Sequence, residues 1–218
     1  VNTPHNPLGL VMSLEDWQTL ATILGDTKVI VLSDEVYEHM VFEGQAHVSV
    51  LQVPELAHRA ISISSFGKTF HATGWKLGYC VAPAHLMAEF RKVHQFNAFS
   101  CDTPKQLGIA QYMSNAEAYL SLPAFYQEKR DYLRSLLDQS KWVRIPSSGS
   151  YFESYRYDQI SDLPDKVFAE KLVKENKIAV IPMSAFYHNA TDHKVIRLCF
   201  AKEKQTLQTA AHCLLQAQ

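Results

Sequence analysis

Two lysines in the middle of the chain, Lys68 and Lys76, lie in a stretch of small, hydroxylated and aromatic residues that carries few other charges. Residues 60–64 alternate between apolar and polar in the manner of a strand, and residues 77–82 form a second strand-like run. A lysine beside a glycine at a strand end can serve as a nucleophile that forms a Schiff base with a carbonyl compound. A solvated surface lysine is the ordinary alternative.

An acidic residue follows an earlier strand-like run. Residues 28–32 are apolar after Lys28 and predict a strand buried on both faces, and Asp34 comes at its carboxyl end. Before it, residues 13–24 predict an amphipathic helix that begins at the N-cap Ser13. Strand, helix and strand in alternation predict a parallel sheet, whose ligands gather beyond the carboxyl ends of the strands. Asp34 is therefore a candidate ligand-binding residue, and a helix cap or a solvated loop carboxylate is its plain alternative.

Two more polar residues lie near the two ends of the chain. Asn6 stands between Pro4 and Pro7 and before a glycine, a composition that predicts a turn. Arg197 lies inside the strand-like run 194–201, where a charge is costly unless it is paired. Its guanidinium could pair with a carboxylate at the rim of the sheet, or it could bind the carboxylate of a ligand through two parallel hydrogen bonds.

The order of these residues resembles the cofactor-lysine region of fold-type I aminotransferases, which use pyridoxal phosphate. The block S-F-G-K-T-F-H-A-T-G-W-K-L-G at 65–78 is similar to that of the kynurenine/methionine aminotransferase branch. The family patterns D-E-V-Y, T-P-H-N-P-x-G and I-R-L-x-F are matched at 34–37, 3–9 and 196–200. Leu8 departs from the usual threonine or serine, at a position that is not a principal cofactor ligand.

The resemblance implies a role for each matched residue. Lys68 would form the Schiff base and, once displaced by substrate, move the proton of the reaction. Asp34 would face the pyridine nitrogen and keep it protonated. The other implied cofactor ligands are Asn6 and Tyr37 at the ring hydroxyl, and Ser65 and Lys76 at the phosphate. Arg197, together with Asn6, would bind the substrate carboxylate.

The implied reaction is transfer of an amino group from a large neutral amino acid, such as methionine, an aromatic amino acid or kynurenine, to a 2-oxo acid. One alternative is a cysteine-S-conjugate β-lyase of the same fold, which cleaves a carbon–sulfur bond after the same proton abstraction. Another is a non-catalytic fragment without cofactor. A nicotinamide dehydrogenase and a serine hydrolase are disfavoured, because no strand is followed by GxGxxG and no GxSxG is present.

The implied architecture is the α/β transferase fold of fold type I. Residues 1–121 would form part of the large cofactor-binding domain, with a parallel-rich sheet, and residues 122–218 a small α+β C-terminal domain. A long amphipathic helix predicted over 122–137 marks the boundary. Because the first residues resemble a strand end without neighbours, and family subunits are nearly twice this length, we expect only the C-terminal half here. The full-length protein is expected to be a cytoplasmic homodimer.

Composition narrows the range of partners. A net charge of −1 argues against nucleic acid or an anionic membrane surface as the main partner. No apolar run reaches the roughly 20 residues that span a bilayer. The four cysteines lack CxxC spacing and are expected to be free thiols in a reducing compartment. His39, His47 and His58 show no metal-ligand spacing, so no metal site is predicted.

Overall fold

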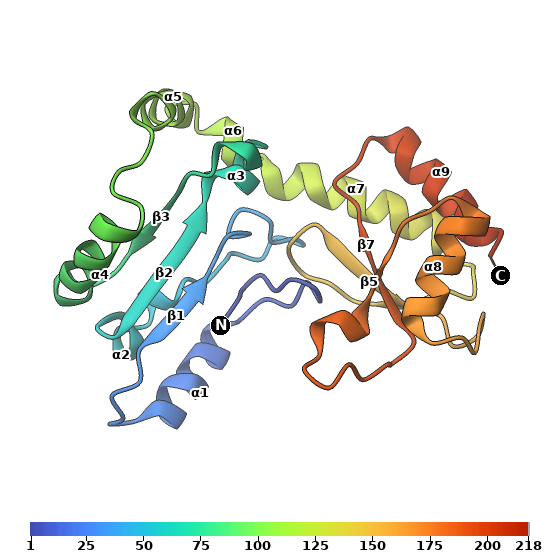
Figure 1. Cartoon of the computed structure of the whole chain (residues 1–218), viewed down its shortest axis with the longest axis horizontal. Coiled ribbons are helices and arrows are strands. Elements are labelled where there is room, and N and C mark those ends of the chain that lie inside the picture. Colours follow the sequence, from blue (N-terminus) through green and yellow to red (C-terminus); the bar gives the residue numbers. More distant parts are fainter. Residues whose placement is uncertain (218) are drawn as a thin grey trace. The chain divides into compact units, whose positions relative to one another are not determined.

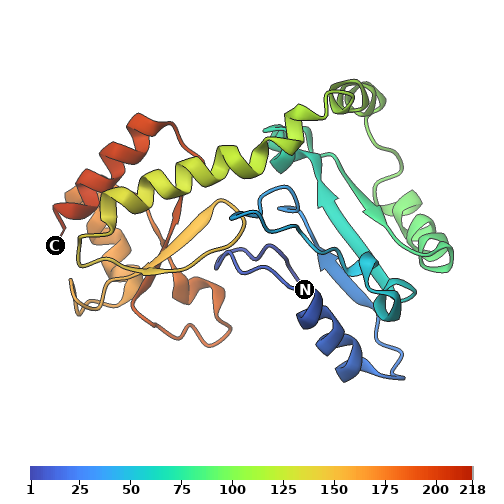
Figure 2. The same ribbon diagram turned by 180° about the vertical axis from the view of Figure 1, so that it is seen from behind.

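The computed structural model describes residues 1–217, which form two compact units, seen from opposite sides in Figures 1 and 2. Unit 1 comprises Val1–Pro4 and Val11–Pro123, and unit 2 comprises His5–Leu10 and Ala124–Gln218. The short segment 5–10 thus belongs to unit 2, although the residues on either side of it belong to unit 1. The sequence predicted a domain boundary between residues 121 and 122. That boundary refers to the domains of complete family members, and it stays a prediction.

The described residues of unit 1 form a three-stranded sheet. Its strands, in spatial order, are β1 (Val31–Asp34), β2 (Ala60–Ser65) and β3 (Gly78–Val81). β1 and β2 run parallel, and β3 pairs antiparallel with β2. Asn2 adds a parallel bridge to Asp34 on the outer side of β1. The parallel pairing predicted from the sequence is therefore present, and the sheet ends in an antiparallel edge strand.

Helix α1 (Leu14–Leu24) begins and ends where its sequence predicts. The Ser13 hydroxyl accepts a hydrogen bond from the Asp16 amide, and the Asp16 carboxylate accepts one from the Ser13 amide, a reciprocal capping box. Gly25 then takes a positive φ of 44° and ends the helix. The other helices of unit 1 are α2 (Pro54–Ala57), α3 (Phe66–Thr69), α4 (Ala84–Asn97), α5 (Thr103–Met113) and α6 (Glu117–Leu120).

One face of the unit 1 sheet is packed, and the other is open at β1 and part of β2. Trp17 of α1 is buried and donates from its indole Nε1 to the Val48 carbonyl at 2.9 Å. The cluster around it contains Trp17, Val31, Val50, Val53, Leu56 and Ala60. On the opposite face Leu32 and Ile63 are 55% and 40% exposed. The sequence predicted a strand over residues 28–32 that is buried on both faces. This prediction is wrong for the described residues, because no described element covers the face of β1 that carries Leu32.

Unit 2 is an α+β assembly around an antiparallel sheet. Its strands, in spatial order, are β4 (Val143–Ile145), β5 (Phe152–Arg156), β7 (Val195–Cys199) and β6 (Ile181–Pro182). The helices are α7 (Leu122–Leu137), whose first two residues belong to unit 1, α8 (Asp165–Asn176) and α9 (Lys204–Leu215). β5 begins at Phe152, two residues after Ser150, which has a left-handed φ of 65°. Among residues 1–217 no helix has the length and apolar character to cross a bilayer.

Candidate functional site

The parallel pairing of β1 with β2 gathers the unit 1 candidates at one edge of the sheet. Asp34 is the last residue of β1, and its register partner is Ile63, two residues before the end of β2. Lys68 follows in α3, which lies directly beyond the end of β2 in Figure 1. Since the carboxyl ends of parallel strands meet at one edge, Asp34, Ser65 and Lys68 all come to this edge.

Backbone hydrogen bonds on the outer side of β1 hold Asp34 in place. Its amide donates to the Val1 carbonyl at 2.9 Å, and its own carbonyl accepts from the Thr3 amide at 2.9 Å and from the Asn2 side-chain amide at 3.0 Å. The carboxylate Oδ1 accepts from the Val36 amide at 3.2 Å. The carboxylate lies on the exposed face of the strand and can meet a ligand there.

A buried carboxylate next to Asp34 was not singled out by the sequence. Glu35 is 2% exposed, and it accepts hydrogen bonds from the Ser33 hydroxyl at 2.8 Å and the Val50 amide at 3.0 Å. His47 Nε2 lies 3.0 Å from its other oxygen, so this histidine is a structural partner of Glu35. Burial acts to raise the pKa of Glu35, but these hydrogen bonds outweigh it and lower that pKa. The network ties β1 to the loop that follows it.

The turn that carries Lys68 is packed too tightly for larger residues. A Cβ at Gly67 would lie 2.9 Å from Thr73 Cα, and one at Gly78 would lie 2.5 Å from the Ser64 carbonyl oxygen. The Ser65 hydroxyl accepts a hydrogen bond from the Gly67 amide at 3.2 Å and so caps α3. Lys68 itself is half-buried. Close backbone packing therefore fixes the base of the lysine side chain.

Lys76 follows a short 3-10 turn, Thr73–Trp75, and takes a left-handed φ of 53°. Its side chain is exposed. A Cβ at Gly74, by contrast, would meet nothing within 4 Å. The glycines that sterics require in this region are Gly67 and Gly78.

A carboxylate and an aromatic cavity lie beside α3. Glu38 Oε1 accepts hydrogen bonds from the Ser64 hydroxyl at 2.6 Å and from the Tyr79 hydroxyl. Burial, reinforced by the neighbouring Glu38, raises the pKa of Tyr79. The adjoining cavity, of about 260 Å³, has Phe66, Phe70 and Tyr119 among its lining residues. The hydrogen bonds of Glu38 tie the segment that follows β1 to β2 and β3.

Unit 2 brings Asn6 and Arg197 together, although they are near opposite ends of the chain. Arg197 Nη1 donates to Asn6 Oδ1 at 2.5 Å. The guanidinium carbon lies 3.9 Å from the centre of the Phe152 ring and 5.1 Å from that of Phe186. Stacking on aromatic faces stabilises a cation and fixes the plane of its fork. Arg197 is therefore preorganised for a flat, bidentate anion such as a carboxylate.

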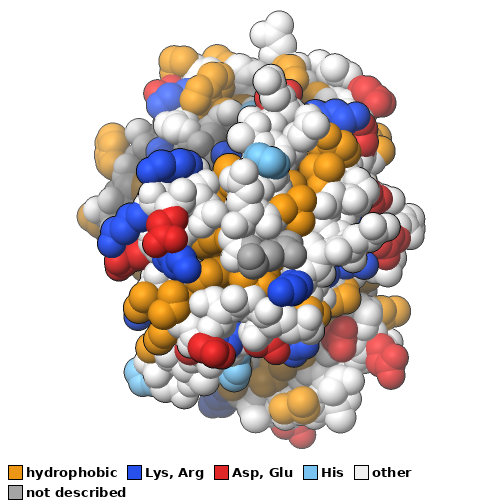
Figure 3. Space-filling model, turned by 90° about the vertical axis from the view of Figure 1, so that its right-hand side faces the viewer, with side chains coloured by type: hydrophobic (Ala, Val, Ile, Leu, Met, Phe, Trp, Pro, Cys, Tyr) orange, Lys and Arg blue, Asp and Glu red, His pale blue; other side chains and the backbone are white. Residues whose placement is uncertain are grey.

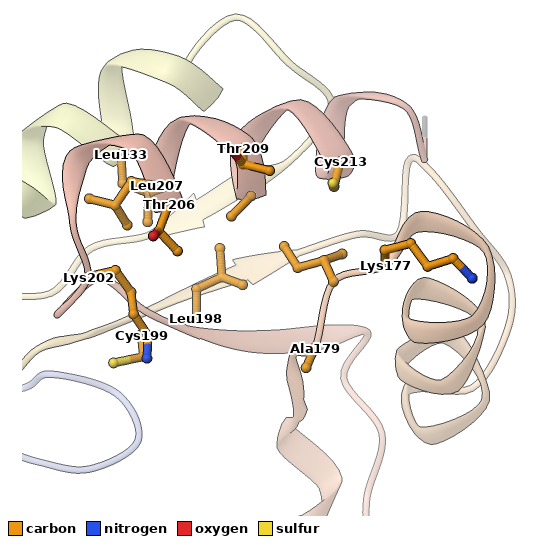
Figure 4. Close-up of a pocket in the computed structure, with 12 residues that line it drawn as sticks. Leu133, Lys177, Ala179, Leu198, Cys199, Lys202, Thr206, Leu207, Thr209 and Cys213 are labelled. Carbon is orange, nitrogen blue, oxygen red and sulfur yellow. The ribbon is translucent and has the colours of Figure 1, made fainter.

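A separate cavity of about 280 Å³ lies on the other side of β7, under α9. Figure 4 shows Leu198 directed toward α9, with Leu207 and Thr206 of that helix opposite. Because successive side chains of a strand alternate, the neighbouring Arg197 faces away from this cavity. The molecular face drawn in Figure 3 carries interspersed acidic, basic and hydrophobic side chains. Among the described residues no group of histidine, cysteine and acidic side chains has the arrangement of a metal site.

Comparison with known proteins assigns the family. The model of aminotransferase classes I and II matches residues 1–214, so the chain belongs to this family, whose members depend on pyridoxal phosphate. The α/β fold of fold type I, expected from the sequence, is thereby confirmed.

Individual relatives agree with this assignment. The chain is 48% identical over 217 residues to methionine aminotransferase of Escherichia coli, and 34% identical over 230 residues to human kynurenine–oxoglutarate transaminase 1. The match covers 99% and 95% of this chain and 56% and 54% of those proteins. The crystal structure of the Escherichia coli enzyme YbdL, identified as a methionine aminotransferase, superposes with a TM-score of 0.96 at 48% identity, covering 99% of this chain and 57% of that one. The chain thus spans a little over half the length of the curated relatives it matches.

The Glu35 network predicts a specific acid sensitivity. The lowered pKa means that ionised Glu35 stabilises the folded state, and this stabilisation is lost as pH falls below the unfolded value of about 4.3. We expect Glu35→Gln to lower the free energy of unfolding by about 1–3 kcal/mol near neutral pH and to flatten its fall between about pH 5 and pH 3. Urea denaturation at a series of pH values measures both effects. The exposed Glu55→Gln is the control, and an equally steep acid loss in both variants would contradict the assignment.

Proposed function

We propose that the complete protein is a pyridoxal-phosphate-dependent aminotransferase that moves the amino group of a large neutral amino acid to a 2-oxo acid. The observation that carries the proposal is the family match over 1–214, with Asp34 at the end of β1 and Lys68 just past the end of the parallel strand β2. The relatives named methionine aminotransferase and kynurenine–oxoglutarate transaminase support methionine, aromatic amino acids or kynurenine as donors.

The donor set of unit 1 has the chemistry that pyridoxal phosphate requires. Lys68 supplies an amine for its aldehyde, and Asp34 an anion for its ring nitrogen. Tyr37 offers a phenol to the ring hydroxyl, while Ser65 and Lys76 offer a hydroxyl and a cation to the phosphate. A Cβ at Gly67 would press on Thr73 of the following turn, so this glycine allows the close packing beside Lys68.

Each residue then has a task in the reaction. When bound, pyridoxal phosphate acts as an electron sink that makes the α-proton of an amino acid removable. Lys68 is half-buried on its short helix. Its Nζ would take that proton from the substrate Cα and release it again later in the reaction. Asp34 keeps a positive charge on the ring nitrogen, because a neighbouring anion favours the protonated form.

Substrate binding falls to unit 2 in this proposal. Arg197 binds the α-carboxylate through its fork, and Asn6, which already accepts from Arg197, holds the fork in orientation. Asn6 would also offer its amide nitrogen to the ring hydroxyl of the cofactor. The proposed protein is a cytoplasmic homodimer, and the four cysteines are free thiols, in keeping with a reducing compartment.

Product analysis of the complete protein tests the reaction class. With methionine and 2-oxoglutarate, we expect glutamate and the oxo acid of methionine in equal amounts, and no turnover when the 2-oxo acid is omitted. Pyruvate and ammonia from a cysteine S-conjugate, formed faster than glutamate and without an oxo acid, would favour the β-lyase instead. Absence of cofactor absorbance together with absence of both activities would contradict the proposal.

The role of Arg197 predicts a defined loss on substitution. Arg197→Lys keeps the charge but removes the fork, so we expect kcat/KM for methionine to fall about 10- to 100-fold. Steady-state kinetics of the complete protein measures this fall, and the absorbance of bound cofactor should not change. The matched control is Arg156→Lys, whose guanidinium pairs with Asp158 at the surface at 3.1 Å. Equal kinetics in the two variants would exclude Arg197 as the carboxylate ligand.

A further inference from the structure

The loop that carries Asn6 is clamped onto a turn before β5. The Gly9 carbonyl accepts hydrogen bonds from the amides of Ser148 and Gly149, both at 2.9 Å. Gly9 has a φ of +69°, and a Cβ at this position would lie 2.5 Å from Ser147 Cβ and 2.7 Å from the Gly149 oxygen. Within the loop, the Gly9 amide donates to the His5 carbonyl at 2.7 Å. The position of Asn6 therefore depends on where the 147–149 turn is held.

Two arginines of α7 hold that turn by a single carbonyl. Arg130 Nη1 and Arg134 Nη2 both donate to the Ser147 carbonyl, at 3.0 and 3.1 Å. Arg130 is 1% exposed, and its remaining nitrogens reach the Asp131 carboxylate at 2.9 Å. A guanidinium can bind a carbonyl and a carboxylate at once because its donors form a rigid fork.

A fully buried carboxylate completes the arrangement. Glu153 of β5 is 0% exposed and accepts two hydrogen bonds from Arg134 Nε, at 2.9 and 3.1 Å, and one from Arg134 Nη2 at 2.5 Å. The Ser147 hydroxyl donates to the same carboxylate at 3.3 Å. Burial raises the pKa of Glu153 and Arg134 opposes that shift. Glu153 follows Phe152, the ring on which Arg197 stacks. The buried ions thus support two of the residues that contact Arg197, namely Asn6 and Phe152.

We propose that Arg130 is a positioning residue for substrate-carboxylate binding, acting through the Ser147 carbonyl and Gly9 to set the contact between Asn6 and Arg197. The inference rests on the proposed role of Arg197 and deepens it. Arg130, the Ser147 carbonyl and Gly9 act by holding Asn6 in place, and none of them needs to touch the substrate. A shift of the turn moves the Asn6 acceptor away from the guanidinium, and a misplacement of about 1 Å can cost about 100-fold in such a site.

Binding of a carboxylic acid without an amino group tests this network in the complete, cofactor-loaded protein. The probe is 4-(methylthio)butanoate, followed by the cofactor absorbance. We expect Arg130→Lys and Gly9→Ala each to raise its Kd about tenfold or more. Because Asn6 is also a proposed cofactor ligand, each Kd for the probe is measured on protein saturated with pyridoxal phosphate. A merely structural role for Arg130 would lower the melting temperature and leave the Kd for the probe unchanged, which would overturn the proposal.

Two further variants separate this inference from the function it rests on. If Arg197→Lys does not weaken the probe, the proposed carboxylate role is itself wrong. If Arg197→Lys weakens it while Gly9→Ala and Arg130→Lys do not, only the network is wrong. Should Arg130→Lys fail to fold, Gly9→Ala carries the test, because it removes no buried charge. The exposed Arg156→Lys is the control and should leave the Kd for the probe unchanged.

Discussion

The parallel pairing of β1 with β2 is the constraint on which the unit 1 site depends. It sets Asp34 beside Ile63 and brings the ends of two strands to one edge, so that a carboxylate and a lysine distant in sequence come to the same edge of the sheet. A slip of one residue in this register would turn Asp34 to the packed face, because strand side chains alternate with a period of two. The Trp17 cluster on that packed face opposes such a slip.

Charged groups are buried in both units only where hydrogen bonds satisfy them. Glu35 in unit 1 has a serine, a histidine and a backbone amide as partners, and Glu153 in unit 2 has a bidentate arginine. An unpaired buried charge would be strongly destabilising, so each such network fixes the segments that supply its members. In unit 1 the segment fixed is the one that bears Asp34, and in unit 2 it is the turn that supports Asn6. Glu35 and Glu153 thus each support a segment that carries a candidate functional residue.

Local signals made part of this structure predictable. The Ser13 capping box, the stop at Gly25 and the positive φ of Gly9 follow from short-range chemistry that a sequence displays directly. The family motifs identified the residues at the sheet edge in the same way. What the sequence did not reveal depends on long-range packing, as with the left-handed Ser150 and the tight contacts of Gly67 and Gly78. The Arg130 and Glu153 partners could not be paired from spacing alone, because tertiary structure brings them together.

The central claim is that Lys68, set by the paired strands, is the amine that binds the cofactor. Borohydride reduction of the complete, cofactor-loaded protein, followed by proteolysis and peptide mapping, tests it most directly. We expect a single pyridoxyl label on the peptide that contains Lys68, and loss of that label in Lys68→Arg. A label on Lys76 or on any other lysine, persisting in that variant, would contradict the account.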